Sequence, residues 1–345
     1  MHDLTARQKE ILARLIEAYV ASPTPVGSRT LAELHPFKLS PASLRHEMGI
    51  LEERGYLTHP HTSAGRVPTD QGYRLYVKER VREEPVSEAL LGFIAREMKG
   101  KIENLEALME RASRILSAVA EETVVVTAPE LRKLYLKELN LVPFDPTRLL
   151  AVWCTTSGLV QDCLVEMEGP VAAEEVDRIR RFINEEFAGE SIDALEEALL
   201  RRMESRRDSL RRLYERTLAI IRDSLLHLER DRLFVVGSRY ILNQPEFQDA
   251  KKVRHLVTLL EEKSALLEML RHQPAEQGVH VAIGAKELSE EMWDCALVSA
   301  SYLWGGRCVG VLGVLGPRRM PYGRIMGLAH RMAGEISRAL AGWGV

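Results

Sequence analysis

Three short segments with helical hydrophobic periodicity, separated by proline and glycine, open the chain and restrict its fold more than any other feature. The first begins at Thr5 and ends before Pro23. The second takes Ser28 as its N-cap, and the third begins after an N-cap at Ser40 and ends at Gly55. A polar loop between two short extended pieces then leads to residue 77. Three helices followed by a hairpin are the order of a winged helix-turn-helix, so we expect that fold at the N-terminus.

The third of these helices offers a surface for base recognition. Leu44, Met48 and Leu51 recur at helical spacing, so one face of the helix should pack on a core. The N-cap and the opposite face carry small or hydrogen-bonding side chains: Ser40, Ala42, Ser43, Arg45 and His46. Because arginine donates two hydrogen bonds to the guanine edge in the major groove, Arg45 is the strongest candidate for reading a base. The alternative is that Arg45 pairs with Glu52 or with the glutamate after it, or lies in solvent.

Hydrogen-bond donors on both sides of Arg45 are expected to contact the DNA backbone. They lie in the second helix, in the turn before the third helix and in the hairpin loop: Ser28, Arg29, Lys38, His61, Thr62, Ser63 and Arg66. Histidine is also a common zinc ligand, but His59 and His61 have no cysteine or carboxylate at ligand spacing. DNA contact is therefore the favoured interpretation, and we expect no metal site.

The bulk composition directs the search for a partner to local patches. Because 47 Lys and Arg face 50 Asp and Glu, the formal net charge is -3 and a polyanion would need a local basic surface. The chain carries no nucleophile elbow, phosphate loop, dinucleotide fingerprint or zinc-protease motif, so we expect no enzymatic activity and no cofactor. Without a membrane-length apolar segment or a signal peptide, the protein is expected to stay in the cytoplasm and off the membrane.

The length of 345 residues predicts two or three domains, and the strand and helix patterns with an antiparallel hairpin predict an α+β architecture. We expect a linker or solvated helix after residue 77 and one long helix over residues 95–122. Residues 139–167 hold three strand patterns of a small meander, and three helical patterns follow up to residue 232. Beyond them strands and helices alternate, with one helix over residues 249–271 and a hairpin turned at Gly305-Gly306. Trp293, Tyr302 and Trp304 could line a small-molecule pocket, but core aromatics are the favoured interpretation.

A homodimer is expected on physical grounds. One winged helix makes too few base contacts for strong specificity, whereas two related by a two-fold axis read a palindrome. The apolar strands and helices from Leu139 to Met203 are the favoured interface, and an ordinary core within one domain is the alternative.

Long motifs at both ends of the chain resemble the HrcA family of heat-inducible transcription repressors. At the N-terminus the similar segment is SPASLRHEMGILEERGYLTHPHTSAGRVPTDQGYRLYV, residues 40–77. At the C-terminus the similar segments are LNQPEF, residues 242–247, the helix VRHLVTLLEEKSALLEML, and GVLGPRRMPYGRIM, residues 313–326. The resemblance covers nearly the whole chain.

The resemblance implies three domains: a winged-helix domain over residues 1–82, a GAF-like domain over 83–136 and 206–345, and an inserted dimerising domain over 137–205. It implies repression through an inverted-repeat operator of double-stranded DNA upstream of the chaperonin and DnaK operons. The GroEL chaperonin would keep the repressor active, and heat would remove that support. The recognition helix maps to residues 40–53 and the wing to residues 61–66; family members often carry Asn in place of His46. The alternative is a metabolite-responsive winged-helix regulator with an effector pocket in the GAF-like domain.

Overall fold

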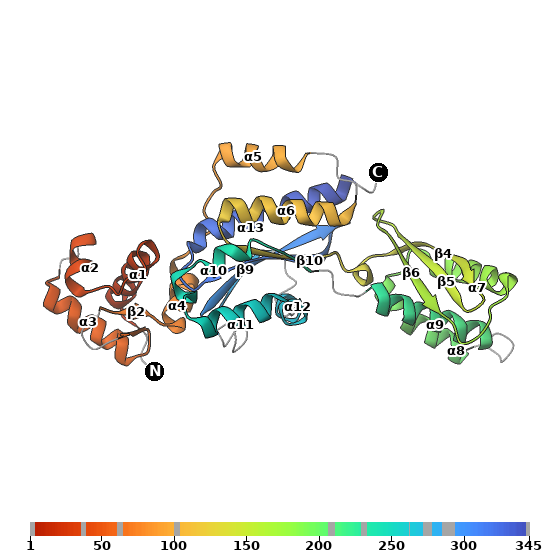
Figure 1. The fold of residues 1–345 in the computed structure, drawn as a ribbon, viewed down its shortest axis with the longest axis horizontal. Helices are drawn as coiled ribbons and strands as arrows, with labels where there is room; N and C mark the ends of the chain where they lie inside the picture. Colours follow the sequence, from red (N-terminus) through yellow and green to blue (C-terminus); the bar gives the residue numbers. More distant parts are fainter. Residues whose placement is uncertain are drawn as a thin grey trace.

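The computed structural model of the chain describes residues 4–35, 39–60, 65–99, 104–205, 211–228, 233–261, 263–271, 278–284 and 294–342. Figure 1 shows three lobes in a row. The N-terminal lobe (residues 4–80) lies at one end, the central lobe (81–134 and 233–342) is built on a five-stranded sheet, and the distal lobe (135–228) is built on a three-stranded sheet. The mixture of helices and antiparallel sheets confirms the α+β class.

The N-terminal lobe contains the three expected helices and the expected short hairpin. Its elements are α1 (Ala6–Ala21), α2 (Ser28–Leu34), α3 (Pro41–Glu53), β1 (Leu57–Thr58), β2 (Val67–Pro68) and α4 (Asp70–Arg80). β1 and β2 pair antiparallel. The prediction of Ser28 as an N-cap was wrong, because Gly27 holds that position without a side-chain hydrogen bond and Ser28 is the first helical residue.

Helix α4 was missed in the sequence, where a loop and an extended piece were expected up to residue 77. The Thr69 hydroxyl caps the helix by accepting a hydrogen bond from the Gly72 N–H at 3.2 Å. Asp70 in the first turn and Lys78 and Arg80 in the last turn complement the helix dipole. The cap residue and the charged ends of α4 were present in the sequence, but the polar residues around them led to the prediction of a loop.

The central lobe is an antiparallel sheet of five strands in the order β7-β3-β10-β9-β8. The strands are β3 (Thr123–Thr127), β7 (Leu233–Val236), β8 (Val279–Ile283), β9 (Cys295–Trp304) and β10 (Arg307–Pro317). The helices and short 3-10 turns are α5 (Glu88–Met98), α6 (Leu105–Ala120), α10 (Ser238–Leu242), η4 (Pro245–Phe247), α11 (Ala250–Glu261), α12 (Lys263–Arg271) and α13 (Tyr322–Ala341). Helices α6 and α13 cover one face of the sheet, with α5 outside them, and α11 and α12 lie on the other side (Figure 1).

Two predicted helices of this lobe are shorter in the structure. The helix expected over residues 95–122 is divided between α5 and α6, and residue 122 already precedes β3. The helix expected over residues 249–271 is divided into α11 and α12. The turn at Gly305-Gly306 is confirmed between β9 and β10, and both glycines have positive φ. Tyr302 and Trp304 are buried, which confirms their interpretation as core aromatics, and Trp293 lies outside the described residues.

The distal lobe is the predicted meander with its helices on one face. The sheet runs β4 (Leu136–Asp145), β5 (Arg148–Thr155), β6 (Val160–Glu166), and the helices are α7 (Ala173–Phe187), α8 (Leu195–Ser205) and α9 (Arg211–Leu228), with a short 3-10 turn η2 (Ile192–Ala194). A further 3-10 turn, η1 (Leu131–Lys133), precedes the lobe and contacts η2. The chain leaves the central sheet after β3 and returns at β7, and these two strands pair with each other. The distal lobe is therefore inserted between two neighbouring strands of the central sheet. Helix α9 packs on β6, α7 and α8, although residues from 206 onward were expected in the GAF-like domain.

Glu122 is an acidic residue buried at the start of β3. Its residue surface is 6 % exposed, and a Cβ on Gly316 of β10 would fall 2.5 Å from its Oε2, so the glycine leaves the room that the carboxyl group occupies. Burial raises the pKa of this carboxyl group from 4.5 to about 8, against the opposing effect of the Arg319 guanidinium.

Replacing Glu122 by Gln should flatten the dependence of stability on pH between about pH 5 and pH 8. Because the folded state holds the proton more tightly than the unfolded chain, the free energy of unfolding of the unmodified protein falls as the pH rises through this window. Glu122→Gln should therefore be more stable at pH 8 by about 1 kcal/mol or more and unchanged at pH 5. Thermal unfolding at both pH values measures this, with the exposed neighbour Glu121→Gln as control; equal pH slopes in all three proteins would contradict it.

Candidate nucleic-acid interface

Helix α3 is anchored so that one of its faces points outward. The Ser40 hydroxyl accepts a hydrogen bond from the Ser43 N–H at 3.1 Å, and Pro41 occupies the first helical position, where its missing N–H has no helical partner to lose. Leu44, Met48 and Leu51 are at most 3 % exposed and fix the inner face on the core of the lobe. The expected N-cap and the expected core face are both confirmed.

The outer face of α3 carries the residues that the sequence singled out. Ser40, Ala42, Ser43, Arg45 and His46 are all exposed. Among the residues that the structure describes, Arg45 forms no ion pair, so the alternative that it is held by Glu52 or Glu53 is not observed. Its guanidinium is available to a partner.

Two glutamates of α3, Glu47 and Glu52, are engaged elsewhere. Glu47 accepts a hydrogen bond from Gln8 Nε2 at 3.1 Å and lies 4.0 Å from Arg7 of α1. Glu52 pairs with the Nε of Arg66 at 2.7 Å and with His59. These pairs offset the negative charge behind the outer face, so Arg45 and His46 present their donors without a competing carboxylate in the described contacts.

Arg66 has a structural part in the hairpin as well as a predicted part in DNA binding. Its backbone N–H and carbonyl exchange hydrogen bonds of 2.9 Å with Val26, which joins the hairpin to the segment before α2. A Cβ on Gly65 would lie 2.5 Å from the Val26 carbonyl carbon, so a glycine is needed before Arg66. The side chain of Arg66 is 25 % exposed, which leaves only part of the guanidinium available to a phosphate.

The other predicted backbone contacts are placed differently. Arg29 is exposed on the first turn of α2, whereas Ser28 is 8 % exposed and lies in the core side of that helix. Lys38, His61, Thr62 and Ser63 lie outside the described residues. Helices α2 and α3 stand at the outer end of the row of lobes, away from the central sheet (Figure 1).

Sequence reasoning missed the glutamate that organises this surface. Glu52 was considered only as a partner of Arg45, whereas it joins α3 to both sides of the hairpin. The spacing of His59 and Arg66 around Glu52 carries no local signal, because the hairpin geometry brings them together. Within the described residues, no group of three or more His, Cys, Asp or Glu side chains could hold a metal ion. Over the same residues, no helix has the length and apolar character of a membrane span.

The whole chain is similar to proteins of one family. The model of the HrcA protein C-terminal domain matches residues 106–326. The heat-inducible transcription repressor HrcA of Symbiobacterium thermophilum is 35 % identical over 331 residues, covering 96 % of this chain and 97 % of that protein. The protein of the same name from Natranaerobius thermophilus is 36 % identical over 342 residues, covering 98 % and 97 %. A crystal structure described as a hypothetical protein covers 99 % of this chain and all of its own, with a TM-score of 0.62 at 20 % identity, and shares the fold.

Arg45 and Arg66 should differ in their effect on stability. Arg45→Ala removes an exposed side chain without an ion pair, so the free energy of unfolding should stay within about 0.5 kcal/mol. Arg66→Ala leaves the half-buried Glu52 without its arginine and should lower the free energy by about 1–2 kcal/mol. Chemical denaturation of both variants measures the difference. Equal losses would show that Arg45 has a structural contact or that the Glu52 pair contributes nothing.

Proposed function

The chain belongs to the HrcA family of heat-inducible transcription repressors, and we propose that it represses transcription as a homodimer bound to an inverted-repeat DNA operator. The observation that carries this proposal is the outer face of α3, where Arg45, Ser43 and His46 are exposed on a helix fixed by its opposite face. In the proposal the N-terminal lobe is a winged-helix domain, the central lobe a GAF-like domain and the distal lobe the dimerising domain. The repressor acts on DNA in the cytoplasm and is not an enzyme.

Helix α3 has the shape and chemistry to enter a major groove. The first turns of its outer face have short side chains at positions 42 and 43, which permit close approach to the bases. Arg45 then reaches the base edges with two parallel donors, a geometry that matches guanine. The neighbouring His46 is also exposed and offers a single ring donor, which suits one base acceptor or a phosphate. Arg29 and Arg66 flank the helix and contact the backbone.

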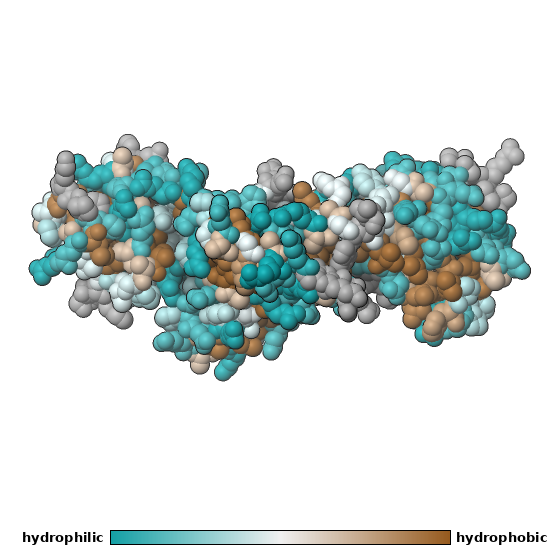
Figure 2. Space-filling model, turned by 90° about the horizontal axis from the view of Figure 1, so that it is seen from above, coloured by the Kyte–Doolittle hydropathy of each residue, from teal (hydrophilic) through white to brown (hydrophobic). Residues whose placement is uncertain are grey.

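The distal lobe supplies the surface for a second copy. The sheet face turned away from α7 and α9 exposes large apolar side chains, namely Val142 at 51 %, Phe144 at 59 %, Val160 at 60 % and Leu164 at 38 %. Brown surface gathers over this lobe in Figure 2. An apolar face of this kind gains free energy when a partner covers it, and an isologous contact between two copies covers both at once.

Release from DNA follows from the marginal stability of folded proteins. In the proposal, heat depletes the folded dimer, and misfolded clients occupy the GroEL chaperonin that would restore it. The operator is then free and the chaperone operons are transcribed. This part rests on the family resemblance. A regulator that responded to a metabolite would instead change its operator affinity when the effector was added and would be indifferent to chaperonin.

Arg45→Ala should weaken binding to the operator by about 1–3 kcal/mol, a factor of ten or more, because a paired base contact is lost. Fluorescence anisotropy measures it on a labelled duplex with the inverted repeat from upstream of the chaperonin operon and on a scrambled duplex, across a salt series and with or without chaperonin and ATP. The control is Arg201→Ala on α8, which removes the same charge from an exposed side chain of the distal lobe. Equal affinity of Arg45→Ala and Arg201→Ala for the repeat would reject α3 as the recognition helix.

Leu164→Glu on β6 should convert the dimer into monomers at micromolar concentration. The substitution places a charge on the exposed apolar face, where dimerisation would bury it without a partner. Sedimentation velocity measures the dissociation constant, which should rise at least tenfold. Arg181→Glu on the exposed face of α7, on the helical side of the same lobe, is the control and should leave the dimer intact. If Leu164→Glu stays dimeric and folded, another surface holds the two copies together.

A further inference from the structure

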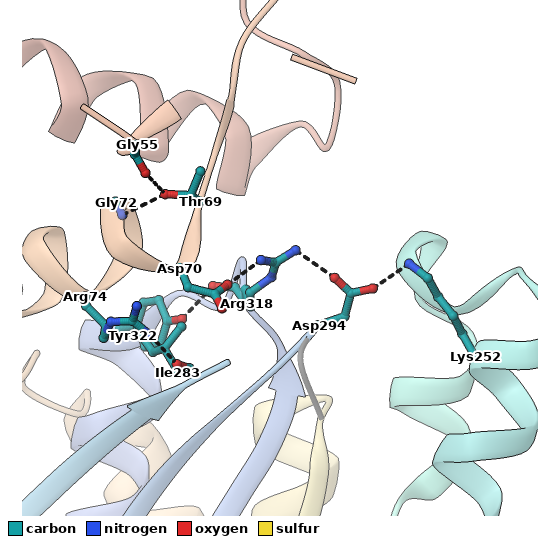
Figure 3. Close-up of polar contacts among 10 residues, drawn as sticks. All are labelled: Gly55, Thr69, Asp70, Gly72, Arg74, Lys252, Ile283, Asp294, Arg318 and Tyr322. Atoms are coloured by element: carbon teal, nitrogen blue, oxygen red, sulfur yellow. Dashed lines mark hydrogen bonds and ion pairs between the residues drawn. The ribbon is translucent and has the colours of Figure 1, made fainter. Parts of the chain in front are cut away.

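The contact between the N-terminal lobe and the central lobe is made through α4. This helix directly follows the hairpin and packs on α1 and β2 on one side and on β8 on the other. Figure 3 shows the polar groups that meet there. Asp70 in the first turn of α4 points at Arg318, which lies in the turn between β10 and α13. The orientation of α3 relative to the central sheet therefore depends on what α4 contacts.

The guanidinium of Arg318 is held between two carboxylates from different lobes. One terminal nitrogen pairs with Asp70 of the N-terminal lobe, and the other donates to Asp294 Oδ1 at 2.7 Å, just before β9. The second oxygen of Asp294 pairs with Lys252 of α11. The side chain of Asp294 is 7 % exposed and that of Arg318 is 25 % exposed, so the network is largely withdrawn from solvent.

The backbone of Arg318 is fixed as firmly as its side chain. Its N–H donates to the Asp294 carbonyl at 3.2 Å, and its carbonyl accepts from the Tyr322 hydroxyl at 2.5 Å. The ring of Tyr322 in turn lies against the ring of Tyr73 of α4, with centroids 6.5 Å apart. The guanidinium is thus presented to Asp70 in one position and one plane.

Two further contacts restrict how α4 can sit. Arg74 Nη1 donates to the Ile283 carbonyl at the end of β8, at 2.9 Å. The next residue, Gly284, has φ +72°, and a Cβ there would lie 2.1 Å from the Asp70 carboxylate. A side chain at position 284 would displace Asp70 from the fork, so the glycine belongs to the same arrangement.

We propose that Arg318 is a positioning residue for operator binding, which sets the angle of the N-terminal lobe and with it the spacing of the two α3 helices in the dimer. The inference rests on the proposed function, because it presupposes that α3 binds DNA. Two recognition helices on one two-fold axis must match the separation of the half-sites along the duplex. Lysine carries the same charge on a single nitrogen and cannot span both carboxylates. The fork geometry, beyond the charge, is what fixes the angle.

The test compares one half-site with two half-sites at different separations. Three kinds of labelled duplex are used. The first is the inverted repeat from upstream of the chaperonin operon, and the second is the same repeat with its central spacer lengthened or shortened by two to five base pairs. The third is a single half-site. The unmodified protein should prefer the natural spacer at least tenfold. Arg318→Lys and Asp70→Asn should keep the half-site affinity within twofold, lose about tenfold on the natural repeat, and bind all spacers within about threefold.

The neighbouring arginine provides a matched control. Arg319 donates to Glu246 Oε1 at 2.5 Å and to Gln244 Oε1 at 2.6 Å, so its contacts stay within the central lobe. Arg319→Lys should retain the spacer preference, even if it lowers the melting temperature. Circular dichroism and sedimentation establish that each variant is folded and dimeric; Asp70→Asn tests the same contact from the other lobe should Arg318→Lys fail to fold.

Three results would overturn the inference. A folded, dimeric Arg318→Lys that keeps the spacer preference shows that other contacts set the angle. A parallel loss on the half-site and on the repeat shows that Arg318 acts on the DNA-binding lobe itself. If the unmodified protein binds no duplex in preference to a scrambled one, the proposed function fails, and this inference fails with it. A normal half-site affinity together with a lost spacer preference can arise only when DNA binding stands and the positioning changes.

Discussion

Strand β10 is the element on which the rest of the structure depends. It pairs along its whole length with β9 on one edge and over residues 312–315 with β3 on the other edge. It is therefore the middle strand of the central sheet. Its first residue, Arg307, lies over the Tyr135 ring at 4.3 Å and donates to the Lys133 carbonyl at 3.3 Å, beside the distal lobe. Its last residue precedes Arg318, which contacts the N-terminal lobe. One strand therefore spans the molecule from one lobe contact to the other.

Two sequence segments far apart meet at the end of this strand. Arg318 and Arg319 are adjacent and turn in different directions, the first to Asp70 and Asp294, the second to Glu246 and Gln244. Residues 242–247 and residues 313–326, which resemble the family as separate motifs, are thus the two sides of one contact. Each arginine needs two acceptors at fixed positions, which is a requirement of geometry that lysine does not meet.

The sequence predicted local structure well where periodicity and end signals agreed. Helix α3, its N-cap Ser40 and its exposed Arg45 followed from spacing alone, because a helix determines its own faces. Strand β3 was missed because its residues, TVVVT, follow a helix almost directly. That helix ends at Glu121 in the left-handed conformation, and the sequence has no glycine there to mark the end. The Arg318 network could not be predicted either. Asp70, Lys252 and Asp294 become neighbours only when α4, α11 and the start of β9 are brought together in the folded chain.

Because the molecule is long, apolar and polar contacts contribute differently to the proposed dimer. Strand β10 has eleven residues, roughly 37 Å at the rise of a strand, and a tilt of about 5° at one end moves the other by about 3 Å, close to the rise of one base pair. Apolar contact is nondirectional and tolerates such a tilt. Charged hydrogen bonds from a planar guanidinium do not tolerate it. In the proposed dimer, the apolar face of the distal lobe supplies affinity between copies, and Arg318, directly after β10, supplies the angle at which each α3 is presented.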